Sequence, residues 1–320
     1  MKTVQTVLGP VATDRLGSVL MHEHICTSSM GVATHYPQLY AADYEQRILR
    51  DLETMRDNGI ATVVDASPVC LGRDVRVLER VSRQTGVHII ATTGWWGCEP
   101  PYVGPTTAEQ WARCFADDIT KGCDSTDIKA GILKAAMDQE GPTEWKKKIH
   151  YAVGLAHLET GAKIMLHTYC PTETPRFQLQ FLKDVGVDMN HVVVDHIPET
   201  TDLDFVKWIY DQGVWLGMDR LPIVQLPGSY AVATDTRIKF IKTMLDAGMG
   251  DRMLFSHDFM STSTLYDNQP EDVQAYVAAQ CPDRFLFLKN YIFPKLGEMG
   301  VDPQALWQMT IDHPRAFFEG

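Results

Sequence analysis

The sequence lacks the close cysteine pairs that build disulfide frameworks or cysteine–zinc sites. Its seven cysteines are odd in number, and the two nearest, Cys114 and Cys123, stand nine positions apart, so no CxxC pair occurs. Reduced thiols in a cytoplasmic protein are therefore expected. No apolar run approaches the roughly 20 residues that a membrane span needs. Residues 1–10 hold too short an apolar stretch for a secretory signal.

Positive charge is also scarce. Lys and Arg total 29 against 41 Asp and Glu, which gives a formal net charge of −12. Such an acidic chain is poorly suited to binding the phosphates of nucleic acids or an anionic membrane surface. Its 320 residues, 45% of them hydrophobic, suffice for a sizeable core. We therefore expect a globular protein whose partner is a small molecule, with no nucleic acid and no membrane.

What the sequence does contain is a repeated unit, in which a short apolar or β-branched run is followed by an amphipathic helical stretch. The predicted strands cover residues 18–22, 61–65, 87–92, 128–134, 162–167, 191–196, 213–218 and 252–257. The predicted helices cover residues 44–58, 75–85, 108–121, 145–160, 176–185, 203–212 and 236–247. Several helices stop at a glycine, the residue that favours the left-handed conformation past a helix end.

Short, continuous apolar strands are typical of a parallel sheet that is buried on both faces. Eight strand–helix units in about 250 residues predict a (β/α)8 TIM barrel, here over residues 17–260. Further helices are expected over residues 270–320, and residues 1–320 are expected to form one domain. An open doubly wound sheet is the alternative, but no GxGxxG motif follows the first strand.

Side chains that can do chemistry recur where these strands end. The first strand ends in His22-Glu23-His24, whose two histidines share one face because strand side chains alternate. The later strand ends carry Lys134, His167, His196 and Asp258. In a parallel barrel all strand ends meet at one face, where active sites lie. Together these side chains are of the types expected to bind two divalent ions through nitrogen and oxygen, without sulfur.

Lys134 is the most informative of these residues, because its strand is apolar and burial of an unpaired ammonium is costly. It could reach solvent along its aliphatic chain or form a salt bridge. It could act as a Schiff-base nucleophile that desolvation makes reactive, as in an aldolase. It could also react with CO₂ to become an anion that bridges two metal ions. The histidines nearby favour this last interpretation, since an aldolase needs no pair such as His22 and His24.

The other histidines lie in different settings. Six of them are expected to be structural or exposed, namely His35, His88, His150, His157, His191 and His313. His257 is ambiguous, since its side chain should point away from that of Asp258.

Several longer motifs occur in a fixed order. They are Met21-His22-Glu23-His24-Ile25, Ala130-Gly131-Ile132-Leu133-Lys134, Met165-Leu166-His167-Thr168, Val194-Asp195-His196, Leu216-Gly217-Met218-Asp219-Arg220 and Phe255-Ser256-His257-Asp258. Residues 8–20 lead into the first motif, and residues 312–318 form a closing one. In order and spacing this set resembles the phosphotriesterase family of the amidohydrolase superfamily, most nearly its lactonase-like branch. The resemblance covers nearly the whole chain.

The resemblance implies a binuclear metal centre, usually of zinc and sometimes of iron, cobalt or manganese. The ligand sets that it implies are His22, His24 and Asp258 for the buried ion, and His167 and His196 for the more exposed one. Carboxylated Lys134 and a hydroxide are expected to bridge the two ions. A homodimer is expected on the same ground.

Three positions depart from the family pattern. Asp195 stands where a small residue is common, Glu199 stands where Asp is more frequent, and Trp95-Trp96 replaces a smaller or single-aromatic arrangement. The first two bear on the proton relay, and the third bears on the substrate.

The resemblance implies that hydroxide attacks a carbonyl or phosphoryl group while Asp258 accepts the proton. Arg220 is expected to orient Asp258 or to contact the substrate, with Glu199 next in a relay. Trp95 and Trp96 are expected to wall the apolar part of the pocket.

The long stretch after the seventh strand, residues 221–234, is expected to select the substrate. Its apolar members Ile223, Val224, Leu226 and Tyr230 favour an acyl chain or an aromatic leaving group. The prediction is a metal-dependent lactonase or carboxylic-ester hydrolase, for example on acyl-homoserine-type lactones, with weaker phosphotriesterase activity. The alternatives are a phosphorylated-lactone or N-acyl amide hydrolase on the same site, the Schiff-base aldolase, and a metal-binding scaffold without activity.

Overall fold

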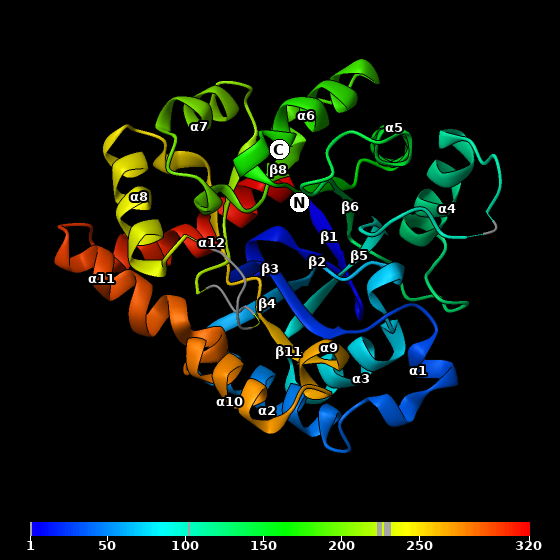
Figure 1. Cartoon of the computed structure of the whole chain (residues 1–320), viewed down its shortest axis with the longest axis horizontal. Helices are drawn as coiled ribbons and strands as arrows, with labels where there is room; N and C mark the ends of the chain where they lie inside the picture. The colour runs from blue at the N-terminus through cyan, green and yellow to red at the C-terminus, as the bar shows by residue number, and fades with distance from the viewer. Residues whose placement is uncertain (1, 102, 223–225, 227–231) are drawn as a thin grey trace.

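The computed structural model describes residues 2–101, 103–222, 226 and 232–320 (Figure 1). Its centre is a curled sheet of parallel strands, and the helices surround this sheet. The eight principal strands are β3 (Ser18–Thr27), β4 (Ile60–Asp65), β5 (His88–Trp95), β6 (Ile132–Ala136), β7 (Lys163–His167), β8 (Val192–Val194), β9 (Trp215–Met218) and β10 (Met253–Phe255). Each strand in this series pairs in parallel with the next.

Helices alternate with the strands along the chain. Those that connect successive strands are α1 (Val32–His35), α2 (Tyr44–Asp57), α3 (Val75–Thr85), α4 (Ala108–Thr120), α5 (Glu144–Thr160), α6 (Thr174–Asp184), α7 (Leu203–Tyr210) and α8 (Thr234–Asp246). Those that follow the last strand are α9 (Thr264–Asp267), α10 (Glu271–Gln280), α11 (Phe293–Glu298) and α12 (Pro303–Glu319). Helix α3 shows the local causes, since Asp74 accepts hydrogen bonds from its first turn and Gly86 ends it with a φ of 77°.

The sheet closes on itself because two short strands share the eighth position. Strand β10 pairs with β9, whereas β11 (Met260–Ser263) pairs in parallel with β3. Between them, the Asp258 amide donates to the His22 carbonyl at 3.0 Å, and the His24 amide donates to the Phe259 carbonyl at 2.9 Å. The predicted (β/α)8 barrel is thereby confirmed.

Two hydrophobic cores stabilise the barrel. One core fills its interior and takes a residue from each principal strand, namely Val19, Val64, Ile90, Ile132, Met165, Val193, Trp215 and Leu254. The other lies between the outer faces of the strands and the helices, and it includes Leu20, Val63, Leu133 and Ile164. The interior is therefore packed with side chains, and any site must lie above this layer, at one end of the barrel.

The amino-terminal end of the barrel is covered. Strands β1 (Thr3–Thr6) and β2 (Gly9–Ala12) form an antiparallel hairpin there, and the Val7 amide donates to the Ile89 carbonyl near the start of β5. Helix α12 packs against the same end, where the hydroxyls of Ser18 and Thr310 are 2.8 Å apart. The carboxyl end of the strands is thus the end that can hold a site.

Several strand boundaries differ from the predicted ones, and three strands differ at the site. Strand β3 continues past His24 because β11 pairs with its carboxyl half. Strand β6 begins at Ile132 and runs two residues past Lys134, and β8 ends at Val194, before His196. Among the described helices, none is long and apolar enough to cross a membrane.

His150 exemplifies the histidines that were predicted to be structural. It is buried on α5, where its Nδ1 lies 2.6 Å from the Lys146 carbonyl and its Nε2 lies 3.0 Å from Gln178 Nε2. A neutral ring satisfies both contacts by donating from Nδ1 and accepting at Nε2. Burial lowers the pKa of His150 to about 4.

Protonation of His150 should therefore lower the stability of the folded protein as the pH decreases. The unfolded chain binds this proton near pH 6.5 but the folded chain only near pH 4, so protonation favours unfolding in this window. From about pH 6.5 to about pH 5, His150 should remove about 2 kcal/mol from the free energy of unfolding. Urea unfolding at both pH values should show that a His150→Gln variant loses about 2 kcal/mol less than the wild type. Equal losses would contradict this assignment.

Candidate metal centre

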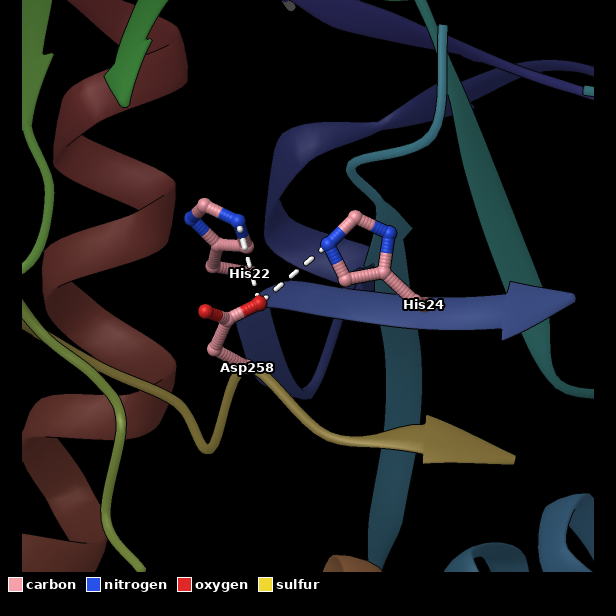
Figure 2. Close-up of side chains that lie close together, drawn as sticks. All are labelled: His22, His24 and Asp258. Atoms are coloured by element: carbon pink, nitrogen blue, oxygen red, sulfur yellow. Dashed lines mark ion pairs between the residues drawn. The ribbon is translucent and has the colours of Figure 1, made fainter. Parts of the chain in front are cut away.

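The carboxyl ends of the strands bring the predicted ligands to one place. His22 and His24 come from β3, and in Figure 2 they point toward Asp258, which follows β10. The rings of His22 and His196 have centroids 5.1 Å apart, and those of His167 and His196 are 4.4 Å apart. Four histidines from three strand ends thus form one cluster with Asp258.

Asp258 lies against the two histidines of the first strand. Its Oδ1 is 3.5 Å from His22 Nε2 and 3.2 Å from His24 Nε2. The other ring nitrogens are occupied, because His22 Nδ1 is 2.9 Å from Asp195 Oδ2 and His24 Nδ1 is 2.7 Å from Ser67 Oγ. We call the three facing atoms, His22 Nε2, His24 Nε2 and Asp258 Oδ1, the acceptor triad.

The protonation of these groups follows from their partners. The Ser67 hydroxyl donates to Asp65, so it accepts from His24 Nδ1, and the carboxylate of Asp195 accepts from His22 Nδ1. Each ring then presents a lone pair at Nε2. Burial lowers the pKa of His22 well below its usual value, which keeps that ring neutral. Three acceptor atoms that face one another in this way form a site that suits a cation.

A second pair of ring nitrogens lies beside the triad. His167 Nδ1 is 2.8 Å from His196 Nε2, while His196 Nδ1 is 2.6 Å from Asp219 Oδ1. The remaining nitrogen of His167, Nε2, is 3.5 Å from Asp138. Burial lowers the pKa of His167 to about 4 and that of His196 well below its usual value, so both rings are neutral.

These residues fit divalent metal ions. Their atoms are imidazole nitrogens and a carboxylate oxygen, the ligand types that zinc and related ions prefer. A carboxylate or hydroxyl holds the second nitrogen of His22, His24 and His196, as is usual for metal-ligating histidines. Among the described residues, His22, His24 and Asp258 have one ligand atom each within 4.8 Å of one another.

Lys134 is fully buried beside this cluster. Its Nζ donates to the Ala66 carbonyl at 2.8 Å and lies 3.3 Å from His22 Nε2. Burial lowers the pKa of Lys134, which raises the share of the neutral amine. Gly94 of β5 permits this packing, since a Cβ at that position would lie 2.0 Å from the Lys134 carbonyl oxygen.

The backbone at the site adopts an uncommon conformation. His196, Arg220 and Asp258 have φ values of 64°, 52° and 56°, and each follows the end of a barrel strand. Non-glycine residues rarely adopt this left-handed region, at a cost of about 1–3 kcal/mol each. The turn at His196 brings its ring into the site although Asp195 already points there. Clustering of such residues at one place indicates function.

Arg220 links Asp258 to Glu199, as the sequence predicted. Its Nε donates to Asp258 Oδ2 at 2.9 Å, and its Nη1 donates to Glu199. Burial opposes the charge of Arg220, but Glu199 and Asp258 raise its pKa above the usual value. The guanidinium therefore keeps its proton. Glu199 anchors Arg220 in this arrangement, and its place in a proton relay stays a prediction.

Asp258 is ionised in this setting. Burial raises the pKa of this carboxyl, but the neighbouring His22 and His24 and the Arg220 guanidinium hold it well below the usual range. Arg220 fixes Oδ2 of this carboxylate, while Oδ1 faces the two histidines of the acceptor triad. Oδ1 can therefore receive a proton from a water bound there.

A cavity of about 440 Å³ opens beside Asp258 and Arg220. Its apolar lining includes Phe259, Met260 and Val277. Its polar lining includes Ser261, Thr262, Gln274 and Arg284. Of the residues predicted to select the substrate, Leu226 is half-buried, whereas Ile223, Val224 and Tyr230 lie outside the described residues.

The two tryptophans lie in different places. Trp95 packs edge to face against Trp111 and Trp145, at centroid distances of 5.5 and 5.9 Å, so its prediction as a pocket wall is wrong. It faces α4 and α5 because side chains alternate along β5. Trp96 is half-buried and lies edge to face with His167 at 5.8 Å, next to a predicted ligand.

Shortening Trp96 should change the choice of substrate. We expect Trp96→Ala to alter the relative kcat/KM values of small and bulky substrates while the metal content stays as in the wild type. Trp95→Ala is the matched control, since it should cost about 3–5 kcal/mol of stability and leave these ratios unchanged. An equal loss for all substrates in Trp96→Ala would reassign this residue to packing.

Sequence reasoning missed the residues that orient the histidines. Ser67, Asp138 and Asp219 were not singled out, although a polar residue just after an apolar strand marks Ser67 and Asp219. Gly217 gives a further sequence signal, because a glycine inside a strand often marks the close approach of another group. A Cβ there would lie 2.4 Å from Asp195 Oδ1, so glycine makes room for that carboxylate.

The family model of the phosphotriesterase family matches residues 2–318. The chain belongs to the phosphotriesterase family. A phosphotriesterase homology protein of Mycobacterium tuberculosis is 31% identical, over 100% of this chain and 98% of that protein. The aryldialkylphosphatase of Saccharolobus solfataricus is 28% identical over 95% of both chains. The N-acetyltaurine hydrolase of Homo sapiens is 25% identical, over 98% of this chain and 96% of that protein.

The resemblance predicted from the motifs is thereby confirmed. As a member of the phosphotriesterase family the chain is a hydrolase, and this family is metal-dependent. Membership therefore disfavours both the Schiff-base aldolase and the scaffold without activity.

Proposed function

We propose that this member of the phosphotriesterase family is a binuclear metal hydrolase that opens lactones or cleaves carboxylic esters, with weaker activity on phosphotriesters. The observation that carries the proposal is the acceptor triad, which suits a cation and whose Asp258 lines a cavity of about 440 Å³. The apolar part of the cavity lining suits an acyl chain.

Two sets of residues would hold the metal ions. They are His22, His24 and Asp258 for one ion, and His167 and His196 for the other. Two divalent ions bound there would supply a hydroxide near neutral pH and polarise the substrate oxygen. We propose zinc as the metal. The cofactors are thus two ions and a carboxylated Lys134.

Carboxylation of Lys134 requires only CO₂. The neutral Nζ adds to the carbon of CO₂, a nitrogen–carbon bond forms, and loss of a proton leaves a carbamate anion. The lowered pKa of Lys134 supports this step, because only the neutral amine reacts. The anion would also remove the cost of a buried ammonium among neutral histidines.

The chain's own residues then divide the work. Asp258 accepts a proton from the attacking water at Oδ1 and returns it to the leaving oxygen. Arg220 fixes Oδ2 of Asp258, and Glu199 holds Arg220 in place. Trp96 limits the space next to His167.

Hydrolysis of N-acyl amides is the second candidate. Relatives named N-acetyltaurine hydrolase match this chain over 98% of its length, at 22–25% identity. Such amides need the same attacking hydroxide but a proton for the leaving nitrogen, which Asp258 would also supply.

A substrate panel distinguishes these activities. Metal-loaded protein is assayed with a medium-chain acyl-homoserine lactone, an aryl ester, a dialkyl aryl phosphate and N-acetyltaurine. We expect the kcat/KM for the lactone or the ester to exceed the others by about tenfold or more. Fastest cleavage of the amide would replace the proposal with the second candidate. Trapping of Lys134 on substrate by borohydride would overturn both.

A further inference from the structure

Glu23 stands between the two histidines of the first strand, but its side chain points the other way and is fully buried. Its Oε1 accepts hydrogen bonds from the Ser256 hydroxyl at 2.7 Å, from the His257 amide at 2.8 Å and from His257 Nδ1 at 2.7 Å. Its Oε2 accepts from the Phe259 amide at 2.9 Å. One carboxylate thus holds the residues on both sides of Asp258.

The turn at Asp258 explains why a side chain is needed there. The left-handed φ of Asp258 interrupts the eighth strand between β10 and β11. The amides of His257 and Phe259 then donate to Glu23 instead of to a neighbouring strand. Without that acceptor, two buried amides would lose their hydrogen bonds, at about 1–3 kcal/mol each. Glu23 therefore stabilises the conformation that presents Asp258 to the acceptor triad.

The hydrogen bonds around His257 show that Glu23 is a carboxylate. The Leu288 amide donates to His257 Nε2 at 3.0 Å, so that nitrogen carries no proton. The ring proton is then on Nδ1 and is donated to Glu23. All four contacts of Glu23 come from donors, which a carboxylate satisfies and a carboxamide does not. His257, whose role was ambiguous from the sequence, is thereby part of this support.

We propose that Glu23 is a positioning residue that sets the place of Asp258 relative to His22 and His24. The backbone of Glu23 carries both histidines as its chain neighbours, and its side chain holds the turn that carries Asp258. A single residue thereby fixes all three members of the acceptor triad. The inference rests on the metal centre of the proposed function, and it predicts that Glu23 tunes the affinity for the ion held by this triad.

The test compares Glu23→Gln with Ser18→Ala in the full chain. Gln keeps the size of Glu23 but turns an amide donor toward the Ser256 and His257 donors or toward the Phe259 amide. We expect affinity for Zn²⁺, measured by chelator competition on metal-free protein, to fall about 10- to 100-fold. Hydrogen exchange at the His257 and Phe259 amides should become faster. Ser18 is buried at the other end of β3, so Ser18→Ala should leave both measurements unchanged.

The outcomes are distinguishable. Wild-type affinity for Zn²⁺ in a folded Glu23→Gln variant, or an equal loss in Ser18→Ala, would overturn this inference alone. Failure of the wild type to bind any Zn²⁺ would overturn the metal centre together with it. If Glu23→Gln does not fold, Ser256→Ala removes one of the four donors, and Zn²⁺ affinity and amide exchange equal to those of the wild type would then overturn the inference.

Discussion

Replacement of Asp258 by Asn is expected to lower kcat by about 10²- to 10⁴-fold. The amide keeps one oxygen toward His24 but cannot accept the proton of the attacking water. If the amide nitrogen of Asn takes the place of Oδ2, it faces the Arg220 donor and that hydrogen bond is lost. The side chain at position 258 would then be less firmly oriented. The measurement is steady-state hydrolysis of the best substrate by metal-loaded protein, with metal content determined on the same samples.

A matched control is available at the other end of the barrel. Asp188 caps the short helical turn before β8, where its carboxylate accepts from the Asn190 amide. Asp188→Asn makes the same chemical change on an exposed carboxylate, and kcat should stay near the wild-type value. If Asp258→Asn retained its metal and lost less than about tenfold in kcat, Asp258 would not be the proton acceptor.

Removal of the Lys134 side chain should strip the protein of metal. In Lys134→Ala we expect most of the bound ions to be lost, because the anion proposed to bridge them is gone and a void remains in a buried strand. Short carboxylic acids such as acetate or propionate should partly restore metal content and activity by filling that void. Metal analysis with and without added acid measures the effect.

Lys163 provides the control for this experiment. It is also a buried strand lysine, but it lies at the start of β7 and donates to the Gly320 carbonyl at 2.8 Å. Lys163→Ala should lower stability and leave the metal content unchanged. Full metal occupancy in Lys134→Ala would show that Lys134 is no bridge.

Much of the fold was predictable because the sequence repeats one simple unit. Eight apolar runs with intervening amphipathic helices predict a parallel barrel. The carboxyl ends of its strands lie at one face for any conformation of the loops. For that reason Lys134 and His167, which lie far apart from the first strand in sequence, could be placed near His22. Ser256 and Glu23 gave no such signal, since their roles depend on contacts across the closure of the barrel.

The exact presentation of the ligands was not predictable from alternation. Met21 points into the barrel core while His22 and His24 also face the site, because the register of β3 against β4 shifts between Leu20 and Glu23. Such irregularities re-aim side chains next to active sites. The left-handed turn at His196 has the same effect, and a residue other than glycine gives no sequence signal for it.

The position of Trp95, in contrast, was predictable from the alternation of side chains along β5. Ile90 points into the barrel, so Trp95, five positions later, must point outward along the same strand. The prediction of a pocket wall relied on its neighbour Trp96, which leaves the strand and lies beside His167. Position relative to the strand end, rather than residue type, decided the role of each tryptophan.

The most direct test of the account is elemental analysis of the purified full chain, prepared with bicarbonate and without chelator. The account predicts two divalent ions per chain, loss of hydrolysis when a chelator removes them, and recovery when Zn²⁺ and bicarbonate are restored. A protein that hydrolyses its substrates with no bound metal would contradict it.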